Sequence, residues 1–341
     1  MPKVSVIMST YNDSKYIRNS IESILNQTYK VFEFIIIDDD STDDTVAIIK
    51  GYDDKRIKLI VNEQNQGLTK NLNKALRIVS GQYVARMDGD DISYLNRLEK
   101  QVEYMDRHSD VYLLGTAIRN IGVSDLYWKL PDDSEELRIR MLLHPVFAHP
   151  SFMFRKELID EGIMYDETFR TAQDYNFAAR VAKKHKIGRL QEVLLCYRVH
   201  EKQISNTSNK NQTDNAARVR EMLLSDLGVS LTDSQREVYN NWVAEKVLSD
   251  PSGYKKAYEI IDTLSKHNDN CGLYDSKKLG DVMRKLLYTW VIRSRNVGLI
   301  LRFPFICNHN FRNMKIFCGE VVRTIKEKFE KKMLRDELCK L

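Results

Sequence analysis

The chain has 341 residues, enough for one large domain or two ordinary ones with a sizeable buried core. Its net charge of +5 is modest and unevenly distributed: residues 293–341 hold 12 Lys and Arg against 5 Asp and Glu, so the rest of the chain carries −2. Basic residues confined to a tail, without interleaved aromatic side chains, argue against nucleic-acid binding.

The five cysteines lie far apart and include no Cys-x-x-Cys pair. This distribution argues against a zinc site or a disulfide framework and is typical of the reducing cytosol. A strand is expected from Val4 onward, which leaves no room for a signal peptide, and no stretch approaches the roughly 18 apolar residues that span a bilayer. We therefore expect a cytoplasmic protein.

Apolar strands and amphipathic helices alternate over the first part of the chain. Strands are expected at residues 4–9, 32–37, 57–61 and 83–87, with helices between them. The second of these strands is apolar throughout, as is typical of a strand covered on both faces. The alternation predicts an α/β fold with a mostly parallel sheet and right-handed crossovers.

Later segments give less regular patterns. Helices are expected at 95–108 and from 132 to about 143, and strands at 111–117, 149–154 and 193–199. Residues 201–213 are rich in Asn, Ser, Thr and Lys, which predicts a mobile loop. Only helices are expected beyond it. The predicted organisation is an α/β domain over residues 1–205 and a helical region over residues 206–341.

Acidic side chains follow two of the predicted strands. Asp38, Asp39 and Asp40 follow the second strand, and Asp88, Asp90 and Asp91 follow the fourth. Ligands of α/β sheets lie at the carboxyl ends of strands, and carboxylates one residue apart form the oxygen pocket that Mg²⁺ or Mn²⁺ prefers. Such an ion could neutralise a diphosphate. Turn chemistry at Asp-Gly and helix capping after the second strand are the structural alternatives.

Eight short motifs occur in a characteristic order within residues 1–205. They are Thr10-Tyr11-Asn12, Asp38-Asp39-Asp40-Ser41-Thr42-Asp43-Asp44-Thr45, Asn65-Gln66-Gly67, Lys70-Asn71, Met87-Asp88-Gly89-Asp90-Asp91, His149-Pro150-Ser151, Gln173-Asp174-Tyr175 and Tyr197-Arg198-Val199-His200. With these motifs the chain resembles the inverting family 2 glycosyltransferases of the GT-A fold, in particular bacterial enzymes of capsule, O-antigen and exopolysaccharide assembly. The helical remainder resembles no family that we can name.

The resemblance implies a nucleotide site at the ends of the first two strands. Thr10 and Tyr11 would lie against the uracil of a UDP-sugar, and Asp39 would accept a hydrogen bond from the ring N–H. Asp38 would support that loop, and Lys70 would be a further nucleotide contact.

The resemblance also implies a donor and metal site after the fourth strand. Asp88 would bind the ribose side of the donor, and Asp90 would coordinate a divalent metal, Mn²⁺ or Mg²⁺, on the diphosphate. Asp91 and Arg198 would contact the donor sugar or support these groups, and His200 is a possible further metal ligand. A histidine at the end of a strand is otherwise often structural.

Asp174 would be the general base, although an aspartate at a helix start is most often a cap or a dipole partner. Three positions depart from the family pattern. Ser9 replaces the usual Pro, Asp40 replaces a Gly, and Gln173 replaces the Glu that commonly precedes the base. Because Gln cannot take a proton, Asp174 is left as the sole candidate base in that motif.

The activity that the resemblance implies is transfer of a hexosyl or N-acetylhexosaminyl group from a UDP-sugar to a glycan, expected to be lipid-diphosphate-linked. The basic tail, with apolar residues at helical spacing, would then touch the anionic inner membrane surface, or pack as an ordinary helix.

Two other functions remain open. A haloacid-dehalogenase-like phosphatase could use Asp38 and Asp40 after an apolar strand, but that motif normally closes the first strand of its fold. A non-catalytic sugar-nucleotide-binding partner is supported only by Gln173 and opposed by the intact Asp174.

Overall fold

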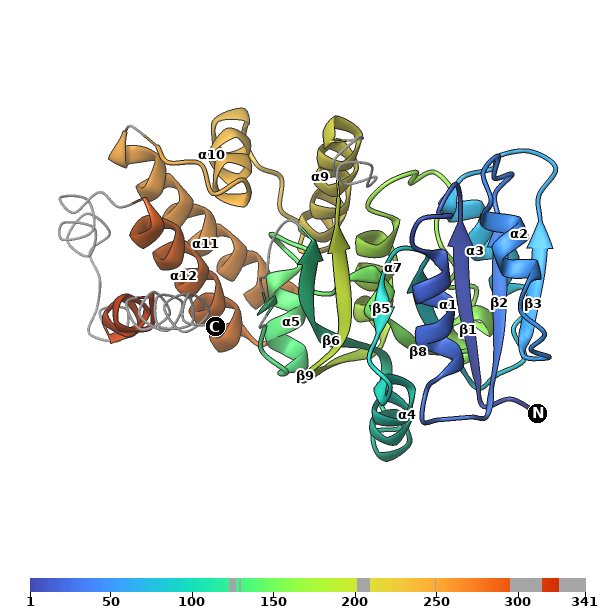
Figure 1. Ribbon diagram of the computed structural model, residues 1–341. Coiled ribbons are helices and arrows are strands. Elements are labelled where there is room, and N and C mark those ends of the chain that lie inside the picture. The colour runs from blue at the N-terminus through green and yellow to red at the C-terminus, as the bar shows by residue number, and fades with distance from the viewer. Residues whose placement is uncertain (123–126, 129, 201–208, 249, 295–314, 325–341) are drawn as a thin grey trace, which may run out of the picture. The chain divides into compact units, whose positions relative to one another are not determined.

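The computed structural model describes residues 1–122, 127–128, 130–200, 209–248, 250–294 and 315–324 (Figure 1). The chain divides into two compact units, each described by itself below. The α/β unit comprises residues 1–141 and 145–221, and the helical unit comprises residues 142–144 and 222–341.

The predicted alternation of strands and helices is confirmed in the α/β unit. Its elements are β1 (Val4–Thr10), α1 (Ile17–Leu25), β2 (Phe32–Asp38), α2 (Thr45–Lys50), β3 (Ile57–Val61), α3 (Leu68–Leu76), β4 (Tyr83–Asp88), β5 (Ile92–Ser93), α4 (Arg97–Arg107), β6 (Val111–Gly122), β7 (Tyr127–Trp128), α5 (Ser134–Arg140), η1 (His149–Ser151), β8 (Met153–Arg155), α6 (Glu157–Asp160), α7 (Gln173–Lys184), β9 (Lys186–Val199) and the greater part of α9 (Asn209–Asp226).

The described strands form one mostly parallel, nine-stranded sheet in the order β3-β2-β1-β4-β8-β6-β9-β5, with β7 beside β6. β1 pairs in parallel with β2 and β4, and its register places Thr10 beside Asp38 and Ser9 beside Asp88. The carboxyl ends of these three strands therefore meet at one edge of the sheet. β8 runs antiparallel to β4 and β6.

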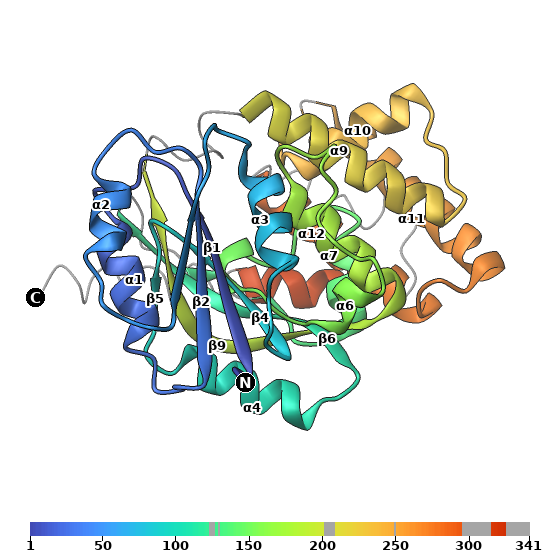
Figure 2. The same ribbon diagram turned by 90° about the vertical axis from the view of Figure 1, so that its right-hand side faces the viewer.

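Helices cover both faces of this sheet. Figure 2 shows α1 and α2 on one side of the strands and α3, α6 and α7 on the other. A core cluster on the first side joins Val6 and Met8 of β1 to Ile21 of α1 and Leu98 of α4. The helices thus bury the apolar faces that the sequence pattern predicts, by packing them against the sheet.

Two predicted segments differ from the structure. Residues 149–154, expected as one strand, begin with the 3₁₀ turn η1, because Pro150 has no N–H to donate to a ladder and the backbone N–H of Ser151 donates to Ala148 instead. Within the expected loop 201–213, residues 209–213 belong to α9, which is anchored by the buried Val219 further along. Residues 201–208 lie outside the described residues, so the domain boundary at 205/206 stays a prediction.

The departure from the family pattern at Asp40 has a backbone explanation. Asp40 has a φ of 67°, in the left-handed region that normally favours glycine. Asp is among the less costly residues there, because its short side chain can hydrogen-bond locally. The position thus needs the conformation that the usual Gly supplies.

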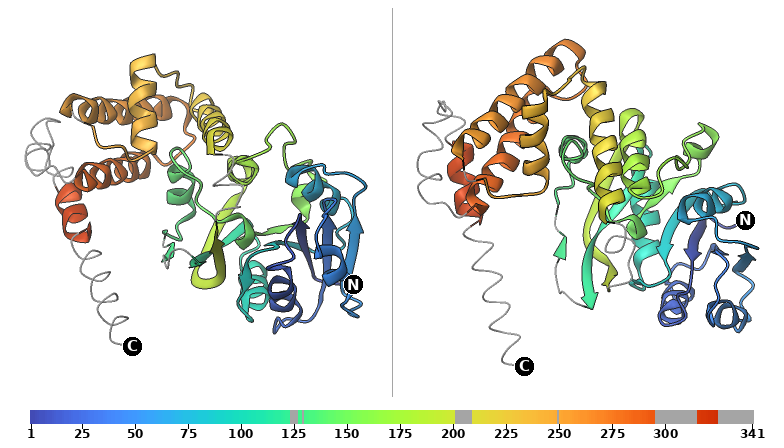
Figure 3. Two further views of the ribbon diagram at one scale, coloured as in Figure 1. Left: turned by 45° about the horizontal axis from the view of Figure 1, so that its top comes forward. Right: turned by 90° about the horizontal axis from the view of Figure 1, so that it is seen from above.

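The helical unit contains α10 (Asp233–Val243), α11 (Pro251–Cys271), α12 (Ser276–Arg293) and a helix at residues 315–324. α11 and α12 lie side by side (Figures 1 and 3). The ring of Trp290 packs 4.5 Å from Tyr254 and 6.2 Å from Trp242, between ring centroids. None of the described helices is both long and apolar enough to cross a bilayer.

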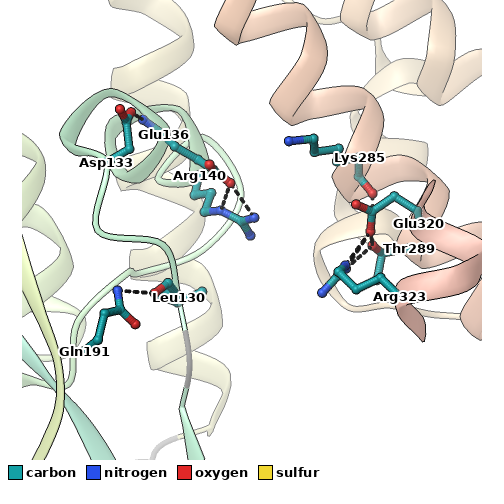
Figure 4. A network of polar contacts seen from close by, with 9 residues as sticks. All are labelled: Leu130, Asp133, Glu136, Arg140, Gln191, Lys285, Thr289, Glu320 and Arg323. Atoms are coloured by element: carbon teal, nitrogen blue, oxygen red, sulfur yellow. Dashed lines mark hydrogen bonds and ion pairs between the residues drawn. The ribbon is translucent and has the colours of Figure 1, made fainter. Parts of the chain in front are cut away.

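Polar contacts fasten helices within each unit (Figure 4). In the α/β unit, Asp133 caps α5 by accepting a hydrogen bond from the backbone N–H of Glu136 at 2.8 Å. In the helical unit, the buried carboxylate of Glu320 accepts from Thr289 of α12 at 3.2 Å and from Arg323 at 2.6 Å. Of the predicted tail helix, only residues up to 324 are described.

A buried carboxylate at the amino-terminal end of the sheet makes the fold acid-sensitive. Burial alone would raise the pKa of Glu33, but hydrogen bonds from Lys58, Ser5 and Ser80 outweigh it and lower the pKa from 4.5 to about 2. Its contribution to stability is therefore complete above pH 4.5 and is lost as the pH falls through 2. By linkage this shift amounts to on the order of 3 kcal/mol.

We expect Glu33→Gln to lower the free energy of unfolding by about that amount at pH 7. The difference from wild type should shrink as the pH falls from 5 toward 2, measured by urea unfolding at a series of pH values. A difference that is the same at every pH would show that the charge of Glu33 does not contribute.

Candidate active site

Three carboxylates meet in the turn that follows β4. One oxygen each of Asp88, Asp90 and Asp91 lie within 4.8 Å of one another. The turn is held from α1, where the Ser20 hydroxyl donates to the backbone oxygens of Asp88 and Asp91, and from β9, where the backbone N–H of Arg198 donates to Asp91 at 2.8 Å. The sheet edge and two neighbouring elements thus fix the cluster.

A fourth carboxylate, to which the sequence analysis assigned no role, lies against this turn. A Cβ on Gly89 would lie 2.5 Å from Oδ2 of Asp13, so any side chain at residue 89 would have to displace the Asp13 carboxylate. Burial raises the pKa of Asp13 to about 6; the hydroxyl of Thr10, 2.7 Å away, opposes this shift, and the charges of Asp90 and Asp88 add to it. The sequence predicts only a polar turn at residues 10–13, and that prediction does not reveal the contact between Asp13 and Gly89.

The end of β9 brings its predicted residues to the same cluster. Nε of Arg198 donates to the backbone oxygen of Asp90 at 2.7 Å, and Nε2 of His200 lies 2.8 Å from Oδ2 of Asp90. Both side chains rest on Tyr16, whose ring centroid lies 4.5 Å from the Arg198 guanidinium and 5.3 Å from the His200 ring.

The predicted nucleotide residues lie at the ends of β1 and β2, in the loops that follow these strands, and on α3. Asp38 is fully buried and accepts from the backbone and the hydroxyl of Ser41 at 3.0 and 2.6 Å. The backbone N–H of Asp39 donates to the oxygen of Thr10 at 2.9 Å, which joins the two loops. Tyr11 is 49% exposed and Lys70 of α3 is exposed, so both are open to a ligand.

The carboxylate of Asp39 organises the loop that precedes α3. It accepts from the backbone N–H groups of Gln66 and Gly67 at 2.8 and 2.9 Å and from the Asn62 amide at 2.9 Å. Burial alone would raise the pKa of Asp39, but these hydrogen bonds outweigh it and lower the pKa. Asp39 is therefore ionised and already accepts hydrogen bonds from the protein.

Asp174 lies in the first turn of α7, two residues after Ala172, whose φ of 54° turns the chain into the helix. Burial raises the pKa of Asp174; backbone hydrogen bonds in the turn lower it, the charge of Asp88 raises it and that of Arg86 lowers it. Burial, Asp88, Asp91, Asp90 and Asp174 together raise the pKa of Tyr197. Asp174 thus lies within electrostatic range of the cluster.

Two buried polar side chains, His149 and Arg86, complete this part of the structure. Nε2 of His149 lies 2.8 Å from the hydroxyl of Tyr165, and Arg86 of β4 forms an ion pair with Asp88. Burial and the charge of Arg86 lower the pKa of His149 well below its ordinary value, so the imidazole is neutral. Sequence reasoning missed Arg86, although a lone charge in the otherwise apolar strand Tyr83–Met87 was the available signal.

The cluster has the chemistry of a divalent-cation site. Burial and the charges of Asp88 and Asp90 raise the pKa of Asp91 well above its ordinary value. Oδ2 of Asp91 is buried and has no hydrogen-bond partner among the described residues. A divalent cation would relieve the repulsion between these carboxylates and would pair with the free oxygen of Asp91. Carboxylate oxygens are ligands that Mg²⁺ and Mn²⁺ prefer.

Comparison with known proteins identifies the family. Residues 5–163 match glycosyl transferase family 2. The chain is 37% identical over 207 residues to the O-antigen biosynthesis glycosyltransferase WbnJ of Escherichia coli, covering 58% of this chain and 80% of WbnJ. The chain belongs to glycosyltransferase family 2. This family 2 enzyme is also 29% identical over 312 residues to an uncharacterized glycosyltransferase of Haemophilus influenzae, covering 84% and 97% of the two chains.

The fold of this family 2 glycosyltransferase is GT-A, as predicted. It is similar to the crystal structure of S. aureus TarS 1-349 in complex with UDP-GlcNAc, with a TM-score of 0.57, 20% identity and coverage of 91% and 93% of the two chains. The family match and the glycosyltransferase relatives confirm the transferase class. The phosphatase alternative has no such support, and the Asp38 that it requires as nucleophile is fully buried and bonded to Ser41.

Proposed function

We propose that this enzyme transfers a hexosyl or N-acetylhexosaminyl group, with inversion, from a UDP-sugar to a hydroxyl of a lipid-diphosphate-linked glycan in surface polysaccharide assembly. The observation that carries the proposal is the pairing of a carboxylate cluster at the strand ends with one carboxylate in the first turn of α7, linked electrostatically. The UDP-GlcNAc complex of TarS and the O-antigen role in the name of WbnJ support the donor and acceptor classes.

In this proposal the loops after β1 and β2 bind the nucleoside. The exposed Tyr11 stacks on the uracil beside Thr10, and Lys70 contacts the nucleotide from α3. Asp38 holds the loop through Ser41. Asp39, the ionised acceptor between these loops, would accept from the uracil N–H.

Asp90 would hold a divalent metal with help from Asp88, Asp91 and His200, whose Nε2 already lies at Asp90. When bound, Mn²⁺ or Mg²⁺ supplies Lewis-acid stabilisation of the negative charge on the leaving diphosphate. Arg198 fixes the backbone of the turn and contacts the donor sugar side.

Asp174 is the proposed general base. Inversion requires one carboxylate on the face opposite the leaving group, which takes the proton of the acceptor hydroxyl as that oxygen attacks the anomeric carbon. A pKa raised by burial moves the carboxylate toward the range in which a base is effective at neutral pH. Gln173 cannot share this role.

The function is tested by a panel of UDP-, GDP- and dTDP-sugars scored by nucleotide release, with and without Mn²⁺, against a lipid-diphosphate sugar acceptor. We expect acceptor-dependent release from a UDP-sugar only when the metal is present. Release from GDP-sugars alone, or release that ignores the acceptor, would contradict the proposal.

We also propose that the basic tail holds the enzyme at the cytoplasmic face of the membrane, since residues 293–341 carry a net charge of +7. Flotation with anionic vesicles should be lost in a chain that ends at Ser294. Equal flotation of both chains would eliminate the tail as the anchor.

A further inference from the structure

Residues 165–172 form an irregular segment between α6 and α7, and this 165–172 segment leads directly into the turn that holds Asp174. Two of its aromatic side chains are buried: Tyr165 is 3% exposed and Phe169 is 5% exposed. Because buried backbone groups cannot bond to water, the N–H and C=O groups at these two residues need partners inside the protein. A neighbouring helix supplies them.

Two buried polar side chains of α3, Thr69 and Asn73, hold the backbone of this segment. The amide of Asn73 bonds Tyr165 twice: its Nδ2 donates to the backbone oxygen at 2.9 Å, and its Oδ1 accepts from the backbone N–H at 3.0 Å. The hydroxyl of Thr69 donates to the backbone oxygen of Phe169 at 2.8 Å. Residues four apart share one face of a helix, so a single face of α3 binds the segment. Figure 2 shows α3 and α7 on the same side of the sheet.

Tyr165 also contacts α7 itself. Its ring stacks on the fully buried ring of Phe177, with 4.6 Å between the ring centroids. Phe177 follows Asp174 by about one helical turn. The hydroxyl of Tyr165 lies 2.8 Å from Nε2 of His149, which fixes the ring from its other end. Asn73, Tyr165 and Phe177 thus form a continuous line of contacts from α3 to the start of α7.

The same helix is attached to the loops that hold the predicted nucleotide residues. It begins after Gly67, whose backbone N–H donates to the carboxylate of Asp39 at 2.9 Å. Nδ2 of Asn71 donates to the hydroxyl of Ser9 of β1 at 3.1 Å. The exposed Lys70 lies between these positions. A nucleotide bound here would therefore restrain α3, and with it the segment that the helix holds.

We infer that Thr69 and Asn73 are positioning residues of the transfer reaction: they attach the segment that leads into Asp174 to the helix that begins at the nucleotide site, so that a bound donor orders the base. This inference rests on the proposed function, because it concerns that donor site and that base. The two side chains act through the position of Asp174 and take no part in the proton transfer. A displacement of a reacting group by about 1 Å can lower a rate by roughly a hundredfold.

The test is hydrogen exchange in the full-length enzyme, followed by mass spectrometry with and without UDP and Mn²⁺. In wild type we expect UDP and Mn²⁺ to slow exchange in peptides from residues 165–172 by roughly fivefold or more, the lower end of couplings between two sites. Thr69→Val, which replaces the hydroxyl by a methyl group, should lose this slowing. It should still bind UDP with an affinity close to that of wild type in calorimetry, while its kcat falls by roughly tenfold or more.

Thr69→Ser keeps the hydroxyl and should restore both the slowing and kcat. Asn215→Ala is the matched control, because Nδ2 of Asn215 donates to the hydroxyl of Thr171 at 2.9 Å from α9, a helix with no predicted nucleotide residue. It should speed exchange in both states and keep the slowing by UDP. Should Thr69→Val fail to fold, Asn73→Asp keeps the acceptor for the N–H of Tyr165 and loses the donor to its oxygen, and it should likewise lose the slowing.

Slowing that persists in Thr69→Val or Asn73→Asp, or a wild type that binds UDP without any slowing, would overturn the inference. The proposed function fails differently. An Asp174→Asn variant that keeps transfer activity would reject the base and leave the exchange result unaffected, because exchange does not depend on catalysis. A wild type without affinity for UDP in calorimetry would reject the proposed donor and the inference with it.

Discussion

Asp174→Asn should lose glycosyl transfer by roughly two to four decades while donor binding is retained, the loss expected when a general base is removed. Asn keeps the size of the side chain and its place in the first turn of α7 but cannot accept the acceptor's proton. In the proposed mechanism Asp174 contacts the acceptor hydroxyl and not the nucleotide, so its removal should leave the affinity for UDP within a few-fold of wild type. The measurement is kcat together with UDP affinity by titration calorimetry.

Asp160→Asn is the control for that variant, because Asp160 of α6 is an exposed aspartate whose contact is a long ion pair with Lys156. It should behave as wild type. Near-normal turnover of Asp174→Asn would remove Asp174 as the base, and loss of UDP binding in parallel with activity would assign it to the donor site instead.

Asp90→Ala should abolish the metal dependence of donor binding and lower transfer by about two decades or more, since a Lewis-acidic metal contributes several kcal/mol and each tenfold corresponds to about 1.4 kcal/mol. The variant removes the carboxylate that also pairs with His200. Titration calorimetry with UDP, with and without Mn²⁺, measures the effect directly: the gain in affinity from Mn²⁺ seen in wild type should disappear.

Asp44→Ala serves as the comparison, because Asp44 is an exposed carboxylate of the neighbouring β2–α2 loop. It should retain the gain from Mn²⁺. An Mn²⁺ effect on UDP binding that persists in Asp90→Ala would place the metal on other ligands or exclude it from donor binding.

The sheet was predictable because its strands carry a local signal. The apolar run before Asp38 and the helical spacing after Asp13 each predict an element without knowledge of its neighbours, and the acids at the strand ends follow from the parallel register. The 3₁₀ turn at His149 was missed because the apolar residues that follow Pro150 dominate the pattern. The helix at residues 209–213 was missed because it is the start of α9, whose packing the polar composition of this segment does not reveal.

The contacts that shape the site depend on residues far apart in the chain. Asp13 lies against Gly89, the Tyr16 ring packs against Arg198, and His200 lies at Asp90. No spacing rule connects such pairs, so the sequence indicated the acids and the family resemblance supplied their roles. The groups that tune those acids became visible only in three dimensions.

The close approach of Asp13 to Gly89 couples two places that a sequence reader would treat as independent. Even a methyl group at residue 89 would collide with the Asp13 carboxylate unless residue 13 became smaller or moved. Laboratory evolution of this enzyme toward new donors should therefore accept side chains at residue 89 more readily when residue 13 is trimmed as well, and a library that randomises both positions should yield more active clones than one that randomises residue 89 alone.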